Sequence, residues 1–199
     1  GHGGQQGERV PRLVKGLAGK KVIGALAGTN HSAVWTDEGE LFTFGYGFHG
    51  QLGHGGHPNE LVPRLIEALV GKKVIGAAAG NFHTAAWTEE GELFTFGHGG
   101  QGRLGHGGTQ SESVPRLVEA LAGKKVVGAS AGGDHTAVWT EEGELFTFGY
   151  ANYGRLGHGE QVNELVPRLV EGLGGKKVIG VSAGDDHTAV WTEAGELFT

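Results

Sequence analysis

The sequence predicts an all-β protein assembled from one repeated unit, as in a propeller or a solenoid. A tryptophan recurs every 52 residues, at Trp35, Trp87, Trp139 and Trp191. A VPRL tetrapeptide recurs with the same spacing, and its prolines are Pro11, Pro63, Pro115 and Pro167. Each copy also contains four short runs of strand-like character. A period of this length with four strands per copy is typical of repeat arrays.

The second copy illustrates the expected elements in chain order. Residues 61–69, LVPRLIEAL, fit a strand or a single helical turn, and Pro63 confines a strand here to an outer edge or to its first residues. Residues 74–79, VIGAAA, are small and apolar, as expected of a crowded inner strand. Residues 83–88, HTAAWT, alternate between two faces, and a glycine-containing turn then reverses the chain into LFTFG. We expect these four strands to form one unit that ends in the glycine-rich connection 97–112.

The composition limits the classes of partner. The 199-residue chain has 16 Lys and Arg against 22 Asp and Glu, a net charge of -6 that gives no general attraction to nucleic acid or anionic membranes. No apolar run approaches the roughly 20 residues that span a bilayer. We therefore expect no nucleic-acid or membrane partner, and a localisation compatible with cytoplasm or nucleus. The absence of cysteine excludes disulfides, and the absence of methionine indicates an excised, processed or engineered segment.

Three strings recur across the copies, namely AG-x-x-HT, T-x-x-G-x-L-F-T-F-G and G-R-L-G-H-G. They resemble the regulator-of-chromosome-condensation repeat over essentially the whole chain. Kelch repeats have a similar length but a different glycine and tryptophan pattern, and WD repeats are shorter. The resemblance implies a β-propeller blade of four antiparallel strands, usually with seven blades in a ring. We expect a single repeat domain over residues 1–199, with units of about 1–52, 53–104, 105–156 and a truncated 157–199.

The number of repeats determines how a ring can close. Four blades alone would turn about 90° each, whereas eight would turn about 45° each, close to the roughly 51° of a seven-bladed ring. Two copies related by a twofold axis would supply eight blades and bury edges that otherwise stay open. We therefore expect a homodimer with two chains per ring. The competing interpretation is a four-blade piece of a longer propeller, either completed by a different chain or present as an open or domain-swapped arc.

Comparison among the copies identifies one variable face. Antiparallel strands place the connection before the histidine strand and the connection after LFTFG at the same end of the unit, and the copies differ in these two segments. Variable loops on a rigid scaffold are where binding proteins place recognition residues. The candidate residues of a protein-binding face are Asn30, Tyr46, Phe48, His49, Phe82, His98, Arg103, Asp134, Tyr150, Asn152, Tyr153 and Asp186. The alternative interpretation is drift in loops that tolerate change.

Residues that are the same in every copy are best explained by a structural role within the blade. Each copy starts its third strand with a histidine, and we expect the ring to hydrogen-bond to loop backbone. Equivalent residues of separate repeats stay well apart, so we predict no metal site and no cofactor. The tryptophans are expected to pack between blades. No serine lies in a nucleophile elbow, and we therefore expect no enzyme activity.

These observations predict a non-enzymatic β-propeller scaffold, natural or engineered, that self-associates and presents its variable face to a protein. The alternative that the resemblance implies is a guanine nucleotide exchange or chromatin-binding factor, because the family's namesake acts on the small GTPase Ran and docks on nucleosomes. A third alternative is inhibition of an enzyme by the propeller face, as in bacterial relatives that bind β-lactamases.

Overall fold

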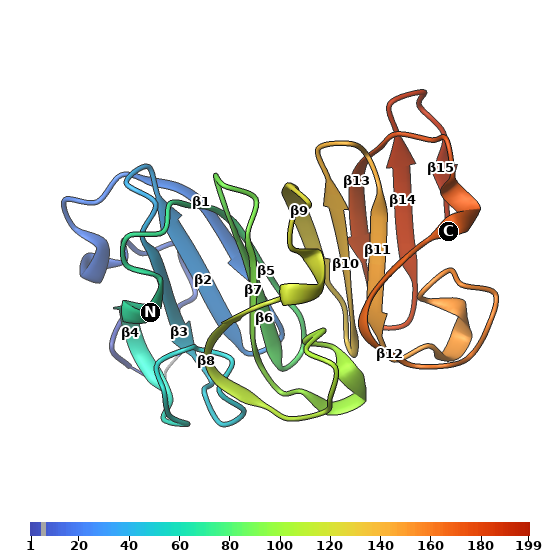
Figure 1. Ribbon diagram of the computed structural model, residues 1–199. Coiled ribbons are helices and arrows are strands. Elements are labelled where there is room, and N and C mark those ends of the chain that lie inside the picture. Colours follow the sequence, from blue (N-terminus) through green and yellow to red (C-terminus); the bar gives the residue numbers. More distant parts are fainter. Residues whose placement is uncertain (5–6) are drawn as a thin grey trace.

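The computed structural model describes residues 1–4 and 7–199 and consists of four antiparallel sheets that lie side by side in an arc (Figure 1). The first three sheets have four strands each and the fourth has three. The two ends of the chain lie at opposite ends of the arc (Figure 1). The predicted all-β class is confirmed, with one sheet for each repeat.

Each sheet is formed by strands that follow one another in the chain. The first contains β1 (Val22–Ala27), β2 (His31–Thr36), β3 (Leu41–Gly45) and β4 (Glu60–Leu65). The second contains β5 (Val74–Ala79), β6 (His83–Thr88), β7 (Leu93–Gly97) and β8 (Glu112–Leu117). The third contains β9 (Val126–Ala131), β10 (His135–Thr140), β11 (Leu145–Gly149) and β12 (Glu164–Leu169). The fourth contains β13 (Val178–Ala183), β14 (Thr188–Thr192) and β15 (Leu197–Phe198).

The helical elements are short 3-10 turns. They are η1 (Lys15–Leu17), η2 (Glu67–Leu69), η3 (Gly100–Gly102), η4 (Glu119–Leu121), η5 (Asn152–Gly154) and η6 (Glu171–Leu173). Within residues 1–4 and 7–199, none of them has the length and apolar character needed to cross a membrane.

In the first three sheets the outer strand comes from the next copy of the repeat, which differs from the predicted unit. β4 contains Pro63, pairs with β3 and places Leu65 opposite Phe42. The predicted outer position of the proline strand is confirmed, but this strand completes the preceding sheet instead of opening its own. The reason is that β3 keeps a free edge after pairing with β2, and the glycine-rich connection returns the chain to that edge. Residues 61–69 were predicted to form a strand or a single helical turn, and they contain both, since β4 is followed by the 3-10 turn η2.

The small, apolar strand is the innermost one, as predicted. β5 contacts β1 and β9, the innermost strands of the neighbouring sheets. Gly76 of β5 lies opposite Trp87 of β6, and a Cβ atom at Gly76 would lie 2.1 Å from the indole Cζ2. Only glycine leaves room for the indole at this position. The same Gly–Trp pair recurs in the other three sheets.

The two faces of each central strand pack on different neighbouring sheets. On β6, Ala85 and Trp87 pack in the apolar cluster shared with the third sheet, whereas Ala86 packs in the cluster shared with the first. This follows from the alternation of side chains along a strand. Trp35 and Trp139 pack in the same way at the other two junctions. The predicted packing of tryptophan between blades is therefore confirmed at all three junctions.

Both ends of the arc expose side chains whose equivalents in the middle of the arc are buried. Leu197 of β15 is 69% exposed, whereas the equivalent Leu93 is 1% exposed. At the other end, Val22 of β1 is 42% exposed, and the equivalent Val74 is 1% exposed. No further sheet among the described residues covers these two faces.

Candidate protein-interaction face

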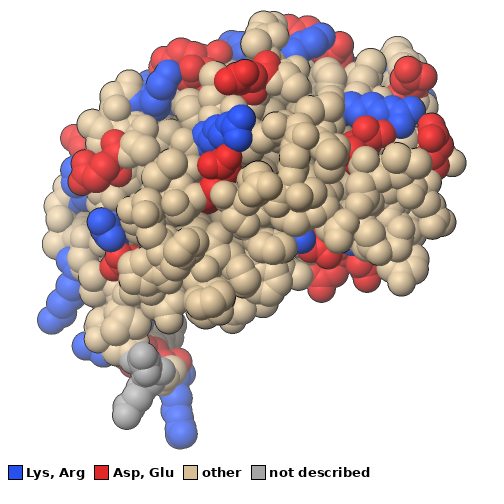
Figure 2. Space-filling model, turned by 60° about the horizontal axis from the view of Figure 1, so that its bottom comes forward, with Lys and Arg blue, Asp and Glu red and all other residues tan. Residues whose placement is uncertain are grey.

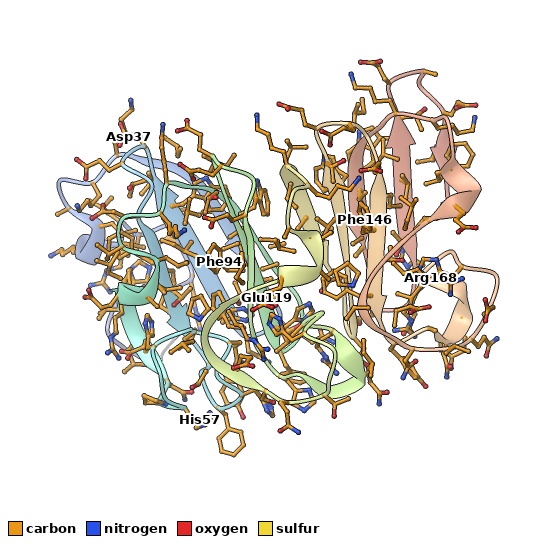
Figure 3. All side chains as sticks on the ribbon, in the orientation of Figure 1. Asp37, His57, Phe94, Glu119, Phe146 and Arg168 are labelled. Atoms are coloured by element: carbon orange, nitrogen blue, oxygen red, sulfur yellow. The ribbon has the colours of Figure 1, made fainter. Side chains whose placement is uncertain are left out.

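The blades present two different ends to solvent. In Figure 3, Asp37 lies at the top and His57 at the bottom, so the turn between β2 and β3 and the long connection between β3 and β4 lie at opposite ends of the sheet. We call the end with the turns after β2, β6, β10 and β14 the hairpin end. The loop end comprises the segments before these four strands and the long connections after β3, β7 and β11.

The hairpin end has nearly the same chemistry in every sheet. The Nζ of Lys72 lies 2.8 Å from Glu92, and that of Lys73 lies 2.7 Å from Glu89. Pairs of the same kind recur on the other sheets. Exposed ion pairs contribute about 0 to 1 kcal/mol each. This end therefore carries little that distinguishes one blade from another.

Two connections from each sheet meet at the loop end, as the antiparallel pattern predicted. The amide of His98 donates to the carbonyl oxygen of Phe82 at 2.8 Å, and the amide of Tyr150 donates to that of Asp134 at 2.9 Å. The backbone thereby holds the variable positions side by side. Figure 2, in which the bottom of Figure 1 comes forward, shows that most of the visible surface carries no Lys, Arg, Asp or Glu.

An arginine and an aspartate close the junction between the second and third sheets. Arg103 is 3% exposed, and its Nη2 lies 2.5 Å from Oδ1 of Asp134. Its Nη1 and Nε donate to the carbonyl oxygens of Gly133 and Gly100 at 3.1 and 2.9 Å. Burial lowers the pKa of the Arg103 guanidinium, and the Asp134 carboxylate counteracts that shift. Arg103 therefore positions the two loops and offers little surface to a partner.

The same kind of pair closes the junction between the third and fourth sheets. The Nη2 of Arg155 lies 2.8 Å from Oδ1 of Asp186. The guanidinium also lies 4.9 Å from the ring centroid of Tyr150 and 5.6 Å from that of Tyr153. Tyr153 is 78% exposed, and its φ of 63° is in the left-handed region, which costs a non-glycine residue on the order of 1 kcal/mol. Asn152 hydrogen-bonds to the Tyr150 hydroxyl.

The junction between the first and second sheets has a different composition. At the positions of the arginine and the aspartate it has Gln51 and Phe82. The ring of His49 packs edge-on against Phe82, with 4.8 Å between centroids, and against His98, with 5.2 Å. Burial lowers the pKa of His98, and the positive charge of Arg103 lowers it further. This junction is closed by aromatic rings where the others are closed by ion pairs.

An aromatic cluster extends from this junction to the surface. Its members are Tyr46, Phe48, His49, Phe82 and His98. Phe48 is 63% exposed, and the other four are partly buried. Gln51 lies beneath at 0% exposure, and its Oε1 accepts a hydrogen bond from the His49 amide at 2.9 Å. The Gln51 Nε2 has no partner within the described part of the chain.

The twelve predicted residues therefore fall into two groups. The first is the aromatic cluster with Asn30, whose carbonyl accepts from the Tyr46 amide at 2.8 Å. The second group contains Arg103, Asp134, Tyr150, Asn152, Tyr153 and Asp186. Sequence comparison missed Gln51 and Arg155, which hold the loops from below. The signal was present in the sequence, because Arg103 and Arg155 are each followed 31 residues later by an aspartate, whereas Gln51 is followed at the same spacing by Phe82.

The histidine that starts each third strand links neighbouring sheets through a threonine. The Nε2 of His83 lies 2.9 Å from Oγ1 of Thr136, whose hydroxyl donates to the carbonyl oxygen of Arg103 at 2.8 Å. Because the hydroxyl proton is used in that bond, Nε2 is the protonated ring nitrogen. The expected bond from imidazole to loop backbone is therefore not direct. A threonine hydroxyl of the next sheet bonds to the imidazole on one side and to the loop carbonyl on the other. The same relay recurs at the other two junctions.

Burial keeps these three histidines neutral. It lowers the pKa of His31 and of His135 to about 4, and it lowers the pKa of His83 well below the ordinary value. The cause is the loss of hydration of the charged ring. Across residues 1–4 and 7–199, no group of three or more His, Cys, Asp or Glu side chains is arranged to hold a metal ion. The three buried histidines therefore connect neighbouring blades through their hydrogen bonds to threonine.

Comparison with known proteins agrees with this architecture. The model of the Regulator of chromosome condensation (RCC1) repeat matches residues 38–87, 90–139 and 142–191. The chain is 38% identical over 190 residues to the human E3 ubiquitin-protein ligase HERC2, and the match covers 94% of this chain and 4% of that protein.

Two solved structures show the same arrangement of blades. Human WBSCR16 has a TM-score of 0.81 and 30% identity, with 90% of this chain and 47% of that chain covered. Prp20p from Saccharomyces cerevisiae has a TM-score of 0.77 and 18% identity, with 85% and 43% covered. The chain spans less than half the length of each of these relatives. It belongs to the RCC1 repeat family of β-propeller proteins.

Proposed function

We propose that the chain is a non-enzymatic β-propeller scaffold that binds a protein partner at its loop end. The observation that carries the proposal is the aromatic cluster, in which Phe48 is 63% exposed above rings that are partly buried. Protein interfaces are enriched in aromatic residues, and a few such anchors carry most of the binding energy. The ion pairs at the other two junctions give the rest of the face a polar rim.

The loop that carries Phe48 is already ordered. The amide of Gly47 donates to Oδ1 of Asn59 at 2.9 Å, and the amide of His49 donates to Oε1 of Gln51 at 2.9 Å. A loop held on both sides of its anchor loses little conformational entropy when a partner binds. This supports the cluster as a binding site in preference to a loop that merely tolerates change.

The test compares two ends of the same blades. A photo-crosslinking residue at position 48 is used to capture the partner, which is then purified and titrated against three forms of the chain. Phe48→Ala is expected to weaken binding at least tenfold, which corresponds to about 1.4 kcal/mol. The matched control Lys73→Ala lies at the hairpin end and is expected to stay within twofold of the wild type. Equal affinities of all three forms would exclude recognition at the aromatic cluster.

The alternative function is guanine nucleotide exchange or chromatin binding. Prp20p is known for binding Gsp1p and histones. The exchange alternative calls for a small GTPase as a probe and the chromatin alternative for purified core histones, and these are the first defined probes. Acceleration of nucleotide release by the 199-residue chain would favour the alternative. Unchanged release, with partner binding that depends on Phe48, would favour the scaffold.

We also propose that two chains associate into one eight-bladed ring. The support is the pair of apolar faces at the ends of the arc, where Leu197 and Val22 are exposed although their equivalents are buried. Stacking one end on the other end of a second copy would bury both faces and leave no open end. Sedimentation equilibrium at micromolar concentration should give twice the chain mass of 20.7 kDa. A single-chain mass under these conditions would overturn the two-chain ring.

A further inference from the structure

The fourth sheet has an outer edge that no strand of residues 1–4 or 7–199 occupies. In the first sheet, β4 fills this edge and places Arg64 opposite Thr43 and Leu65 opposite Phe42. β8 and β12 fill it in the second and third sheets. The equivalent edge of β15 has no strand partner in the described part of the chain.

The N-terminal segment has the sequence of the missing strand. Residues 8–13 read ERVPRL, and β4 and β12 both read ELVPRL. The structure shows no ladder pairing of residues 8–13 within the described chain, and the segment is exposed, with Val10 at 69% and Leu13 at 82%. Among the described residues, the segment therefore has the sequence of an outer strand but no sheet, and β15 belongs to a sheet that has no outer strand.

Two local features of the segment match an outer strand, although Arg9 and Val10 form a bend where β4 is extended. Arg12 Nη1 lies 2.6 Å from Glu8 Oε1, and the equivalent pair in β4 is also 2.6 Å apart. Val14, which follows the segment, has φ and ψ of -80° and 96°, and the equivalent Ile66 has -81° and 96°. The C-terminal end of the segment would therefore need little rearrangement when it joins a ladder.

The same chain does not bring the two features together. Residues 8–13 belong to the first end of the arc and β15 to the other end, and Figure 1 shows these ends far apart across four sheets. A second copy with its arc reversed would present its first end where β15 lies. A twofold axis would then make the exchange reciprocal.

We propose that residues 8–13 of a second copy add to β15 as the fourth strand of the last sheet. This rests on the two-chain ring proposed above and names the segment that closes it. By analogy with β4, Arg12 of one copy lies opposite Thr199 of the other, and Leu13 lies opposite Phe198. The amide of Val14 then donates to the carbonyl of Leu197, as Ile66 donates to Leu41 at 2.9 Å. Backbone pairing of this kind is β-augmentation, and it removes an open edge from each end.

The absence of cysteine makes the register directly testable. Arg12→Cys and Thr199→Cys are made in separate chains, and both positions are exposed, so both variants should fold. Directly opposite residues of an antiparallel pair have Cα atoms about 4.5 to 5.5 Å apart, which suits a disulfide. Mixing the two chains and oxidising them is expected to give a reducible heterodimer. The Leu13→Cys chain is the matched control, because its side chain leaves the strand on the opposite face.

Four outcomes are distinguishable. Cross-linking of Thr199→Cys with Arg12→Cys, and far less with Leu13→Cys, supports the exchange. A dimer mass without preferential cross-linking overturns the exchange and leaves the two-chain ring intact. A single-chain mass overturns both proposals. A chain that carries both Arg12→Cys and Thr199→Cys provides the last outcome. If it forms a disulfide within itself and keeps the mass of a single chain, the strand does not come from a second copy.

A second measurement does not depend on substitutions. Hydrogen exchange of the wild-type amides in β15 should slow as the chain concentration rises, because the added strand protects the edge. The amides of β11, which already has its outer strand, serve as the internal reference. Exchange rates in β15 that do not change while the sedimentation mass doubles would contradict strand addition.

Discussion

Acidification from pH 7 to pH 5 is expected to destabilise the fold through the buried histidines between the sheets. His31 is 3% exposed and His135 is 0% exposed, and each ring donates from Nε2 to a threonine while its Nδ1 has no partner among the described residues. A second proton would therefore enter a site that offers it no acceptor. The unfolded chain takes up protons near pH 6.5, whereas the folded chain does so only near the lowered pKa of about 4.

The magnitude follows from this difference. Stability from these groups is fully present above pH 6.5 and is lost as the pH falls toward 4, because the unfolded state binds more protons throughout that window. At pH 5 each ring costs about 2 kcal/mol relative to pH 7, or about 4 kcal/mol for His31 and His135 together. His83 acts in the same direction. A domain of ordinary stability has about 5 to 15 kcal/mol in total, so the loss is easily measured.

The assay is urea unfolding followed by tryptophan fluorescence at pH 7, 6 and 5. The wild type is compared with a His31→Gln/His135→Gln variant, whose carboxamide N–H replaces the imidazole donor without a titrating group. The difference in unfolding free energy between the two proteins is expected to change by about 4 kcal/mol over this range. His187→Gln, at the exposed equivalent position, controls for the substitution itself at pH 7. Parallel pH profiles for wild type and double variant would refute the reasoning.

Two further predictions use the same unfolding assay, and each compares a crowded or buried position with an open or exposed one. Gly76→Ala is expected to cost about 1 to 3 kcal/mol, because the new Cβ would lie 2.1 Å from Trp87, whereas Gly172→Ala, with nothing within 4 Å, should change stability by less than about 0.5 kcal/mol. Equal effects would show that the sheet shifts to admit the methyl group. Leu145→Ala, at 3% exposure, should cost about 2 to 5 kcal/mol, and Leu197→Ala, at 69% exposure, should cost about 0.5 kcal/mol in dilute solution. The cost at Leu197 should rise with chain concentration if a second copy packs on this face, and a large cost in the dilute monomer would contradict the open end.

The candidate face shows which features comparison of the copies predicts and which it does not. The variable positions were predicted from differences among copies, and the antiparallel pattern correctly placed both connections at one end. Comparison did not show that His49 packs against Phe82 and His98, because these rings come from two sheets. Nor did it show that Arg103 lies buried beneath its loop, with one of its bonds reaching the carbonyl of Gly133. Burial depends on the neighbouring sheet, which no local pattern describes.

The sequence by itself determined the number of sheets, the order of strands within each copy and the two faces of every central strand. These follow from the 52-residue period and from the alternation of side chains, which are local properties of the chain. Tertiary structure alone decided that β4 completes the preceding sheet, since the proline strand has the same sequence whichever neighbour it joins. It also decided that a threonine of the next sheet relays each histidine bond, across a separation of 53 residues. Which groups form these hydrogen bonds depends on which strand edges are unpaired and which polar groups are buried. Both are defined only once the sheets are assembled.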